Sequence, residues 1–230
     1  GMNRMTPEGK AKLEELIARV MKDGQARGIA VGIVNAAGEI QYENYFGYRD
    51  AENRLPITRD TIFGMASVTK SFTALSIMQM QQDGLLKVDD PVSRYIPEFT
   101  NKNQSEPVKL WHLMCHSGGY FPLPRIVVDK TAQEMGIEDS LDAELIYRED
   151  FAEEGIRRVA GRLDDQTRFT GRPGQRMSYC NDGFGLLSDI VRRHSGYGSF
   201  AEYLDKKILK PIGMDRSNIS FIRNSQDENA

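Results

Sequence analysis

The stretch G-M-A-S-V-T-K-S-F-T-A-L-S-I-M-Q-M-Q-Q-D at residues 64–83 joins a polar loop to a long apolar run. It places Ser67 and Lys70 three residues apart at the point where the apolar run begins. The spacing predicts a helix over 67–83 that ends at Gly84. Apolar side chains cover most of its circumference, and such a helix is typically buried, so we expect it in the core.

Ser67 and Lys70 form the first candidate catalytic pair. Side chains three apart in a helix lie on the same face. If the helix begins at Ser67, the hydroxyl lies near unsatisfied backbone N–H groups, where the helix dipole favours negative charge. A partly desolvated lysine one turn further is a better base, so the pair predicts an activated nucleophile. The alternative is a helix-capping serine followed by an exposed lysine.

A second constellation lies in R-P-G-Q-R-M-S-Y-C-N-D-G-F-G at 172–185, in a loop just before a predicted helix. Tyr179 and Asn181 stand two apart, so in an extended stretch their side chains point the same way. The phenol can transfer a proton, and the amide can hold a substrate carbonyl or the lysine. The alternative is a tyrosine that packs its ring and an asparagine that caps the following helix.

The rest of the chain predicts a lopsided mixture of elements. Thr6-Pro7-Glu8 is a helix start, and Gly24 fits the end of that helix. Two strands at 29–35 and 39–46 form a hairpin, which by itself is only marginally stable and needs more strands or a helix to lie on. Further helices are expected at 109–116, 141–160, 182–195 and 198–209.

Five segments in a fixed order carry a resemblance to a known family. They are S-V-T-K at 67–70, L-L-K-V-D-D-P-V-S-R-Y-I-P-E-F at 85–99, H-L-M-C-H-S-G at 112–118, R-P-G-Q-R-M-S-Y-C-N at 172–181 and K-P-I-G-M at 210–214. Together they resemble the serine β-lactamase and penicillin-binding-protein superfamily, nearest to its class C-like branch of β-lactamases, esterases and D-alanyl peptidases. The resemblance covers about residues 10 to 216.

This resemblance implies an α+β fold of the β-lactamase/transpeptidase type. Residues 1–60 would hold the N-terminal helix and the hairpin of the α/β part. Residues 61–216 would form the mostly helical subdomain with the S-x-x-K and Y-x-N motifs, and 217–230 would be a tail. The remaining strands of the sheet would be missing from this chain.

The resemblance also implies the roles of four residues. Ser67 would be the acylated nucleophile, Lys70 its general base or proton relay, and Tyr179 a partner in proton transfer. Asn181 would contact the substrate amide and the lysine. The reaction would be acyl transfer from a β-lactam, a D-alanyl peptide or a small ester through a covalent acyl-enzyme, without a cofactor. The alternative is a non-catalytic sensor that uses the same cleft.

One motif of the family is missing. A K-T-G or H-x-G segment would follow on a later strand and would supply the second oxyanion donor. The letters H-S-G at 116–118 and 194–196 stand in the wrong places for it. We therefore expect a truncated family member with impaired activity, completed by self-association or by a partner chain.

Composition excludes other classes of function. Charged residues make up 27% of the chain and the net charge is −3, so there is no basic footprint for nucleic acid. No apolar stretch approaches the roughly 20 residues that span a bilayer. The N-terminus lacks the pattern of a signal peptide, so the chain as given is expected in the cytoplasm, or in the periplasm or outside the cell if a leader was removed.

His112 and His116 stand four apart on a predicted helix, with Cys115 between them. This is metal-ligand spacing, but a zinc site needs further ligands and usually a signature such as H-E-x-x-H. We therefore expect no metal and assign the two histidines to packing or loop hydrogen bonds. Cys180 should point away from the cleft if Tyr179 and Asn181 point into it.

Overall fold

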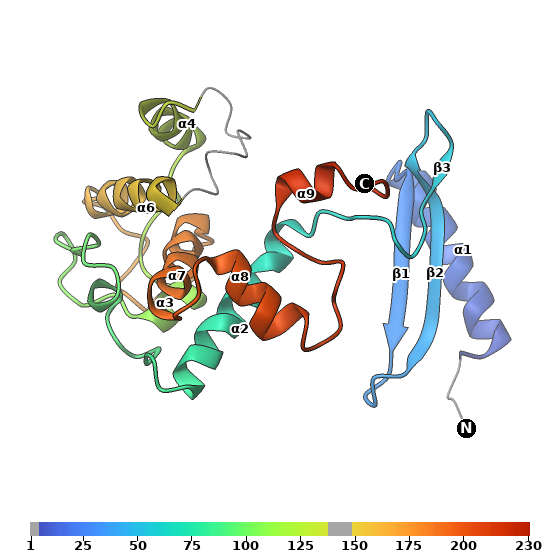
Figure 1. Ribbon diagram of the computed structural model, residues 1–230, viewed down its shortest axis with the longest axis horizontal. Helices are drawn as coiled ribbons and strands as arrows, with labels where there is room; N and C mark the ends of the chain where they lie inside the picture. Colours follow the sequence, from blue (N-terminus) through green and yellow to red (C-terminus); the bar gives the residue numbers. More distant parts are fainter. Residues whose placement is uncertain (1–4, 138–148) are drawn as a thin grey trace. The chain divides into compact units, whose positions relative to one another are not determined.

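The computed structural model describes residues 5–137 and 149–230 (Figure 1). It divides into two compact units. The first holds the described residues up to Gly64 together with Arg223–Ala230, and the second holds those from Met65 to Ile222. Residues 141–148 of the polar helix predicted at 141–160 lie outside the described residues. The domain bounds 1–60, 61–216 and 217–230 stay a prediction.

The first unit is a three-stranded antiparallel sheet with one long helix. Helix α1 spans Pro7–Asp23, and the Thr6 side chain accepts the Gly9 N–H at 3.0 Å, which confirms the predicted cap. The strands β1 (Gly28–Val34), β2 (Ile40–Asp50) and β3 (Leu55–Pro56) lie in the order β1-β2-β3. The sequence predicted the hairpin but not β3, which is only two residues long.

Side chains of α1 contact the sheet at β2. Tyr42 donates to Glu14 at 3.1 Å and is buried, as is Ile17 of the helix. The apolar side chains Ile33, Val34 and Ile40, at the far end of the hairpin, are exposed instead. The hairpin therefore rests on a helix, as a marginally stable sheet requires, while part of its apolar surface remains uncovered within the described chain.

The end of the chain belongs to this first unit. Helix α9 spans Phe221–Ser225. The Ile62 N–H donates to the Asn229 carbonyl at 2.9 Å, and Arg49 donates to the Ala230 carbonyl at 2.8 Å. Backbone and side-chain hydrogen bonds thus hold the last residues against β2 and the segment that follows the sheet.

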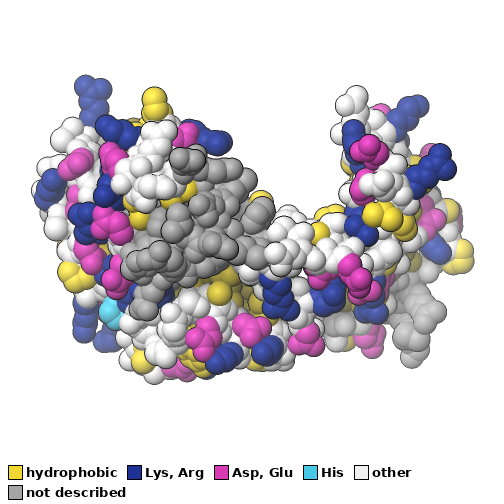
Figure 2. All heavy atoms as spheres, turned by 45° about the horizontal axis from the view of Figure 1, so that its top comes forward, with side chains coloured by type: hydrophobic (Ala, Val, Ile, Leu, Met, Phe, Trp, Pro, Cys, Tyr) yellow, Lys and Arg dark blue, Asp and Glu magenta, His cyan; other side chains and the backbone are white. Residues whose placement is uncertain are grey.

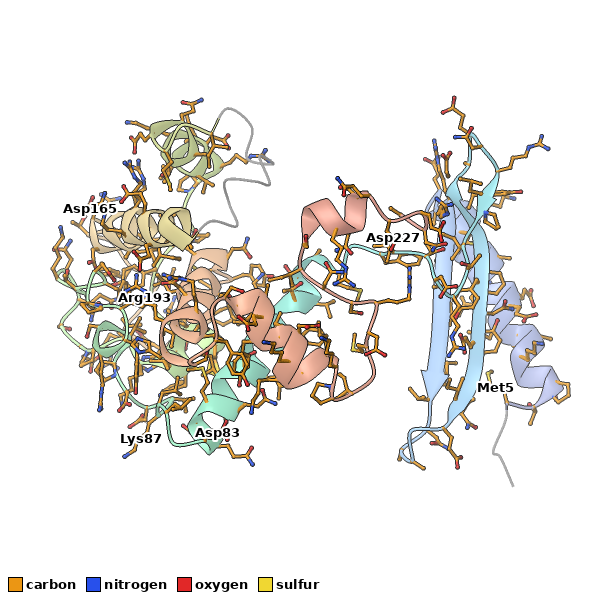
Figure 3. The ribbon with its side chains drawn as sticks, viewed as in Figure 1. Met5, Asp83, Lys87, Asp165, Arg193 and Asp227 are labelled. Atoms are coloured by element: carbon orange, nitrogen blue, oxygen red, sulfur yellow. The ribbon has the colours of Figure 1, made fainter. Side chains whose placement is uncertain are left out.

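The second unit is helical. Its elements are η1 (Ala66–Val68), α2 (Thr69–Gln82), η2 (Val92–Arg94), α3 (Leu110–Met114), α4 (Arg125–Glu134), α6 (Glu149–Asp164), α7 (Asn181–His194), α8 (Phe200–Leu204) and η3 (Asp205–Leu209). The core centres on α7, whose Leu186, Leu187 and Ile190 are fully buried. Arg193, labelled in Figure 3, anchors the same helix through ion pairs with Asp189 and Glu98.

Helix α2 is less buried than the sequence predicts. Ile77 and Met80 are fully buried, but Leu75 and Met78 are 46% and 43% exposed. The reason is that α2 packs against α7 and α8, which cover only part of its circumference. The expectation of a helix that is buried on all sides is therefore wrong for this chain.

The surface carries both signs of charge. On the face drawn in Figure 2, lysine and arginine side chains are interspersed with aspartate and glutamate. This agrees with the nearly balanced composition, and no area of a single sign stands out on that face. Among the helices of the described residues, none is long and apolar enough to cross a membrane.

Candidate active site

Ser67 lies in a turn of 3-10 helix, Ala66–Val68, that leads directly into α2. The residue before it, Ala66, has a φ of +44°, in the left-handed region that a residue with a Cβ rarely adopts. No side chain caps either η1 or α2. The capping role that was the alternative for Ser67 is therefore not seen, and its hydroxyl is exposed at the surface of the second unit.

Lys70 lies one turn further along and reaches back to the serine. Its Nζ donates to the Ser67 Oγ at 3.0 Å, and its side chain is half-buried. The structure thus brings together the two residues that the three-residue spacing pairs. Lys70 is in contact with the hydroxyl rather than directed into solvent, as the alternative would require.

Tyr179 joins this pair from the loop before α7. Its hydroxyl donates to the Ser67 Oγ at 2.6 Å, and Lys70 Nζ lies 4.8 Å from the centre of its ring. The hydrogen bond with Lys70 lowers the pKa of the Tyr179 phenol most, and the hydrogen bond with Ser67 lowers it further. A phenol that ionises more easily beside a serine hydroxyl is suited to accept its proton.

The loop that carries Tyr179 is held against the end of α3. The Gly174 N–H donates to the Ser117 carbonyl at 2.7 Å, and the Ser178 N–H donates to the His116 carbonyl, also at 2.7 Å. Gly174 has a φ of +83°, and an added Cβ would stand 3.1 Å from the His112 ring. The R-P-G-Q turn therefore needs a glycine to approach the histidine so closely.

Asn181 and Cys180 follow the tyrosine. Cys180 is buried while Tyr179 and Asn181 are exposed, which confirms that the cysteine points the other way. Asn181 is the first residue of α7. Within residues 5–137 and 149–230, its side chain makes no hydrogen bond, so the structure does not join it to Lys70. Three of the four predicted site residues are thus brought together.

The two histidines each accept a backbone hydrogen bond. The His112 Nδ1 accepts the Lys109 N–H at 2.8 Å at the start of α3, and burial lowers the pKa of His112. The His116 Nδ1 accepts the Cys180 N–H at 3.0 Å. No group of three His, Cys, Asp or Glu side chains in the described part of the chain is arranged to hold a metal ion.

His116 is the neighbour of the site that sequence reasoning missed. Its ring lies 4.3 Å from the Tyr179 ring and 5.0 Å from the Phe184 ring, measured between centroids. The sequence offered packing or a loop hydrogen bond for His116 but could not say against which residue. In the sequence, His116 stood out only by its position at the end of a predicted helix, and that position does not indicate which residue its ring contacts.

The matched family model carries the description Beta-lactamase and covers residues 13–224. The esterase EstB of Burkholderia gladioli is 32% identical over 209 residues, which is 89% of this chain and 50% of EstB. The octameric penicillin-binding protein homologue from Pyrococcus abyssi superimposes with a TM-score of 0.77 at 36% identity, over 95% of this chain and 46% of that one.

A class C β-lactamase in complex with cefoxitin superimposes with a TM-score of 0.68. The alignment covers 90% of this chain and 50% of that protein, and at 23% identity it speaks for the fold alone. The chain therefore spans about half the length of the relatives that it matches.

Proposed function

Because this chain belongs to the beta-lactamase family, we propose that it transfers an acyl group from a β-lactam, a D-alanyl peptide or a small ester to Ser67. The family and the α+β fold of β-lactamase/transpeptidase type expected from the sequence are confirmed by the matches. The hydrolase character of the relatives supports a serine hydrolase in general. The residues, the substrate class and the activity of this chain form the proposal.

One observation carries it: two side chains from different elements meet at one serine oxygen. Lys70 Nζ and Tyr179 OH lie 3.0 Å and 2.6 Å from the Ser67 Oγ. A nucleophile needs a proton acceptor in hydrogen-bond reach and a group that stabilises the charge that forms. The tyrosine and the lysine supply these two functions at one oxygen.

In the proposed first step, the Tyr179 phenolate accepts the Ser67 proton as the Oγ bonds to the substrate carbonyl carbon. The carbonyl electrons move to its oxygen, and the Ser67 N–H, at the start of a helical turn, faces the developing negative charge. The Lys70 ammonium stabilises the phenolate before the transfer.

The proton then moves from the Tyr179 hydroxyl to the leaving group as the bond between that group and the carbonyl carbon breaks. An acyl-enzyme on Ser67 remains. In the second half-reaction, the phenolate accepts a proton from water as the water oxygen bonds to the acyl carbon. The bond between that carbon and the Ser67 Oγ then breaks, and the Oγ takes the proton from the Tyr179 hydroxyl, which restores the phenolate and releases the acid. The Asn181 side chain, exposed and without a hydrogen bond among the described residues, is proposed to bind the substrate carbonyl or amide.

A small ester is the first substrate to test. The relative that is 32% identical is named an esterase. The site is also open, since Tyr179 is 44% exposed, and an ester needs less activation than an amide.

We also propose that the sheet is completed by further strands, from self-association or from a partner chain. In the described part of the chain, β1 has β2 on one side and no strand on the other. A free edge and the exposed Ile33, Val34 and Ile40 form the kind of surface on which strands add. Native mass spectrometry that shows only monomer at micromolar concentration would count against this.

The test of the function is the intact mass of the protein after incubation with a fluorophosphonate or a penicillin, beside a Ser67→Ala variant. We expect an adduct on the parent and none on the variant. With the penicillin, an acyl adduct that persists would favour the alternative of a sensor, and a transient adduct with product release would establish a hydrolase. The fluorophosphonate adduct persists in both cases and reports only that Ser67 is reactive. No adduct with either probe would overturn the proposal for this chain.

A further inference from the structure

The rings of His116 and Tyr179 are in contact in a tilted arrangement beside the serine site. Their centroids are 4.3 Å apart and the planes differ by 33°, and His116 contacts Phe184 of α7 in a similar way at 5.0 Å. The imidazole therefore lies between the phenol ring of the loop and the helix that the loop enters. We propose that His116 is the positioning residue of Tyr179, holding the phenol where it meets Ser67. This rests on the role proposed for Tyr179.

Backbone hydrogen bonds on both sides of Tyr179 also end on His116. The Ser178 N–H donates to the His116 carbonyl at 2.7 Å, and the Cys180 N–H donates to the His116 Nδ1 at 3.0 Å. One residue thus binds the residue before the tyrosine, the residue after it, and its ring. Such contacts fix both the backbone and the side chain, which is what a catalytic group in a loop requires.

The hydrogen bond to Cys180 also fixes the protonation state of the histidine. A backbone N–H can only donate, so Nδ1 must carry a lone pair and the proton of the neutral ring must be on Nε2. A second proton on the ring would occupy Nδ1 and break this bond. His116 therefore holds the loop as a neutral imidazole.

The surroundings favour that neutral form. Burial, followed by the positive charge of Lys70, lowers the pKa of His116. Lys70 comes from α2, the loop contributes the Tyr179 phenol and the Cys180 N–H, and α7 contributes the uncharged Phe184. The Asp182 carboxylate of α7 lies against the Cys180 thiol and the Leu123 N–H. An imidazolium would add a second positive charge beside the lysine, in competition with it for the phenol.

The backbone of His116 adopts a conformation that few residues tolerate. Its φ is +55°, and its N–H closes the end of α3 on the Leu113 carbonyl at 3.1 Å. Glycine is the usual residue at such a position, and asparagine is next. A histidine at this position is sterically strained, and its three contacts with the tyrosine loop offset the free energy of that strain.

The same backbone constraint indicates the informative substitutions. In His116→Asn, the side-chain oxygen occupies the place of Nδ1 and can accept the Cys180 N–H, while the ring is lost. In His116→Gly, both are lost, and φ is tolerated in each variant. His112→Asn is the matched control, since His112 also accepts a backbone N–H through Nδ1, and its ring faces Gly174 of the same loop instead of the tyrosine.

The first measurement is the pKa of the Tyr179 phenol, determined from the tyrosinate absorbance as the pH is raised. Each protein is compared with its own Tyr179→Phe derivative, so the difference reports this tyrosine alone. In the parent we expect a pKa below the ordinary value of about 10. In His116→Gly it should return toward that value, in His116→Asn it should move part of the way, and in His112→Asn it should not move.

The second measurement is the rate of fluorophosphonate labelling at Ser67 as a function of pH. Loss of the ring contact should slow labelling roughly three- to tenfold in His116→Asn. Loss of the hydrogen bond as well should slow it roughly tenfold further in His116→Gly.

An unchanged Tyr179 ionisation in His116→Gly would overturn the positioning role, as would an equal change in His112→Asn. Failure of the parent to react at Ser67 contradicts the proposed function, whereas the phenol titration tests His116 without any need for turnover.

Discussion

The Tyr179 hydroxyl lies 2.6 Å from the Ser67 Oγ, although 112 residues of chain separate the two. The end of α3, which holds the loop that carries Tyr179, and the start of α2, which carries the serine, therefore bring the two hydroxyls within hydrogen-bond distance. Lys70 contacts the same oxygen at 3.0 Å, so two side chains from different elements form hydrogen bonds with the serine hydroxyl.

Tyr179→Phe should leave the fold intact and slow acylation of Ser67. The ring contacts with His116 are kept, but the proton acceptor is removed, and a positioned acid–base group is typically worth about 10²- to 10⁴-fold in rate. The measurement is the rate of labelling by a fluorophosphonate, together with the far-ultraviolet circular dichroism of both proteins.

Tyr48→Phe is the matched control, because Tyr48 is also 44% exposed but lies in β2. It should react at the rate of the parent. A Tyr179→Phe protein that is labelled as fast as the parent would show that the phenol takes no part in proton transfer.

The labelling rate should rise with pH and level off below pH 10. The hydrogen bonds with Lys70 and Ser67 lower the pKa of Tyr179, so the phenolate forms at lower pH than in a free tyrosine. Lys70→Met removes the first of these causes, so the midpoint of the profile should move to higher pH and the rate at neutral pH should fall.

Lys102→Met provides the comparison for that experiment. Lys102 is an exposed lysine of the same unit that pairs with Asp165 at 3.0 Å. Its replacement should leave the midpoint where it is. A midpoint that stays the same in Lys70→Met would contradict the electrostatic role of Lys70.

The sequence predicted the local parts of the site and not its long-range parts. The contact between Ser67 and Lys70 follows from helical spacing, and the opposite direction of Cys180 follows from the alternation of an extended stretch. The meeting of Tyr179 with Ser67 does not follow from any local pattern. It depends on how α2, α3 and α7 pack, and only the resemblance to a family indicated it.

The helices and strands show the same difference between features that the local sequence determines and features that depend on packing. The ends of α1 were predicted because a threonine cap and a glycine stop act locally. The exposure of Leu75 and Met78 was not, because it depends on which neighbours pack against α2. Strand β3 was missed because two residues are too few to show an alternation.

Ala66→Gly should test whether backbone strain before the serine matters. A φ of +44° destabilises the folded state by about 1 kcal/mol for alanine but not for glycine. Glycine also gives the unfolded chain more conformational entropy, which lowers the free energy of unfolding by a similar amount. The melting temperature should therefore change little. Labelling at Ser67 should slow roughly three- to tenfold, because a freer backbone holds the hydroxyl less firmly.

Ala66→Val is the opposite substitution at the same position. A β-branched residue is strongly disfavoured at positive φ, so this variant should unfold at a lower temperature than the parent. If Ala66→Gly reacts at the full rate, the left-handed conformation serves only to connect the loop to the helix.

Asp164→Asn should destabilise the helical unit without changing the chemistry at Ser67. The buried carboxylate accepts the Thr100 N–H at 2.7 Å, the Thr100 hydroxyl at 2.8 Å and the Asn101 N–H at 2.8 Å. In the asparagine, an NH2 group would replace one of these oxygens and would point at a donor group that has lost its acceptor. We expect a loss of about 2 kcal/mol, or about 4–8 °C in melting temperature.

The neighbouring residue supplies the control for this last substitution. Asp165, labelled in Figure 3, has a side chain that is 72% exposed and pairs only with Lys102 among the described residues. Asp165→Asn should therefore change stability by less than about 0.5 kcal/mol. Equal melting temperatures for the two variants would mean that the Asp164 hydrogen bonds add no net stability. A slower reaction at Ser67 in Asp164→Asn alone would mean that the loop at 100–106 helps to shape the site.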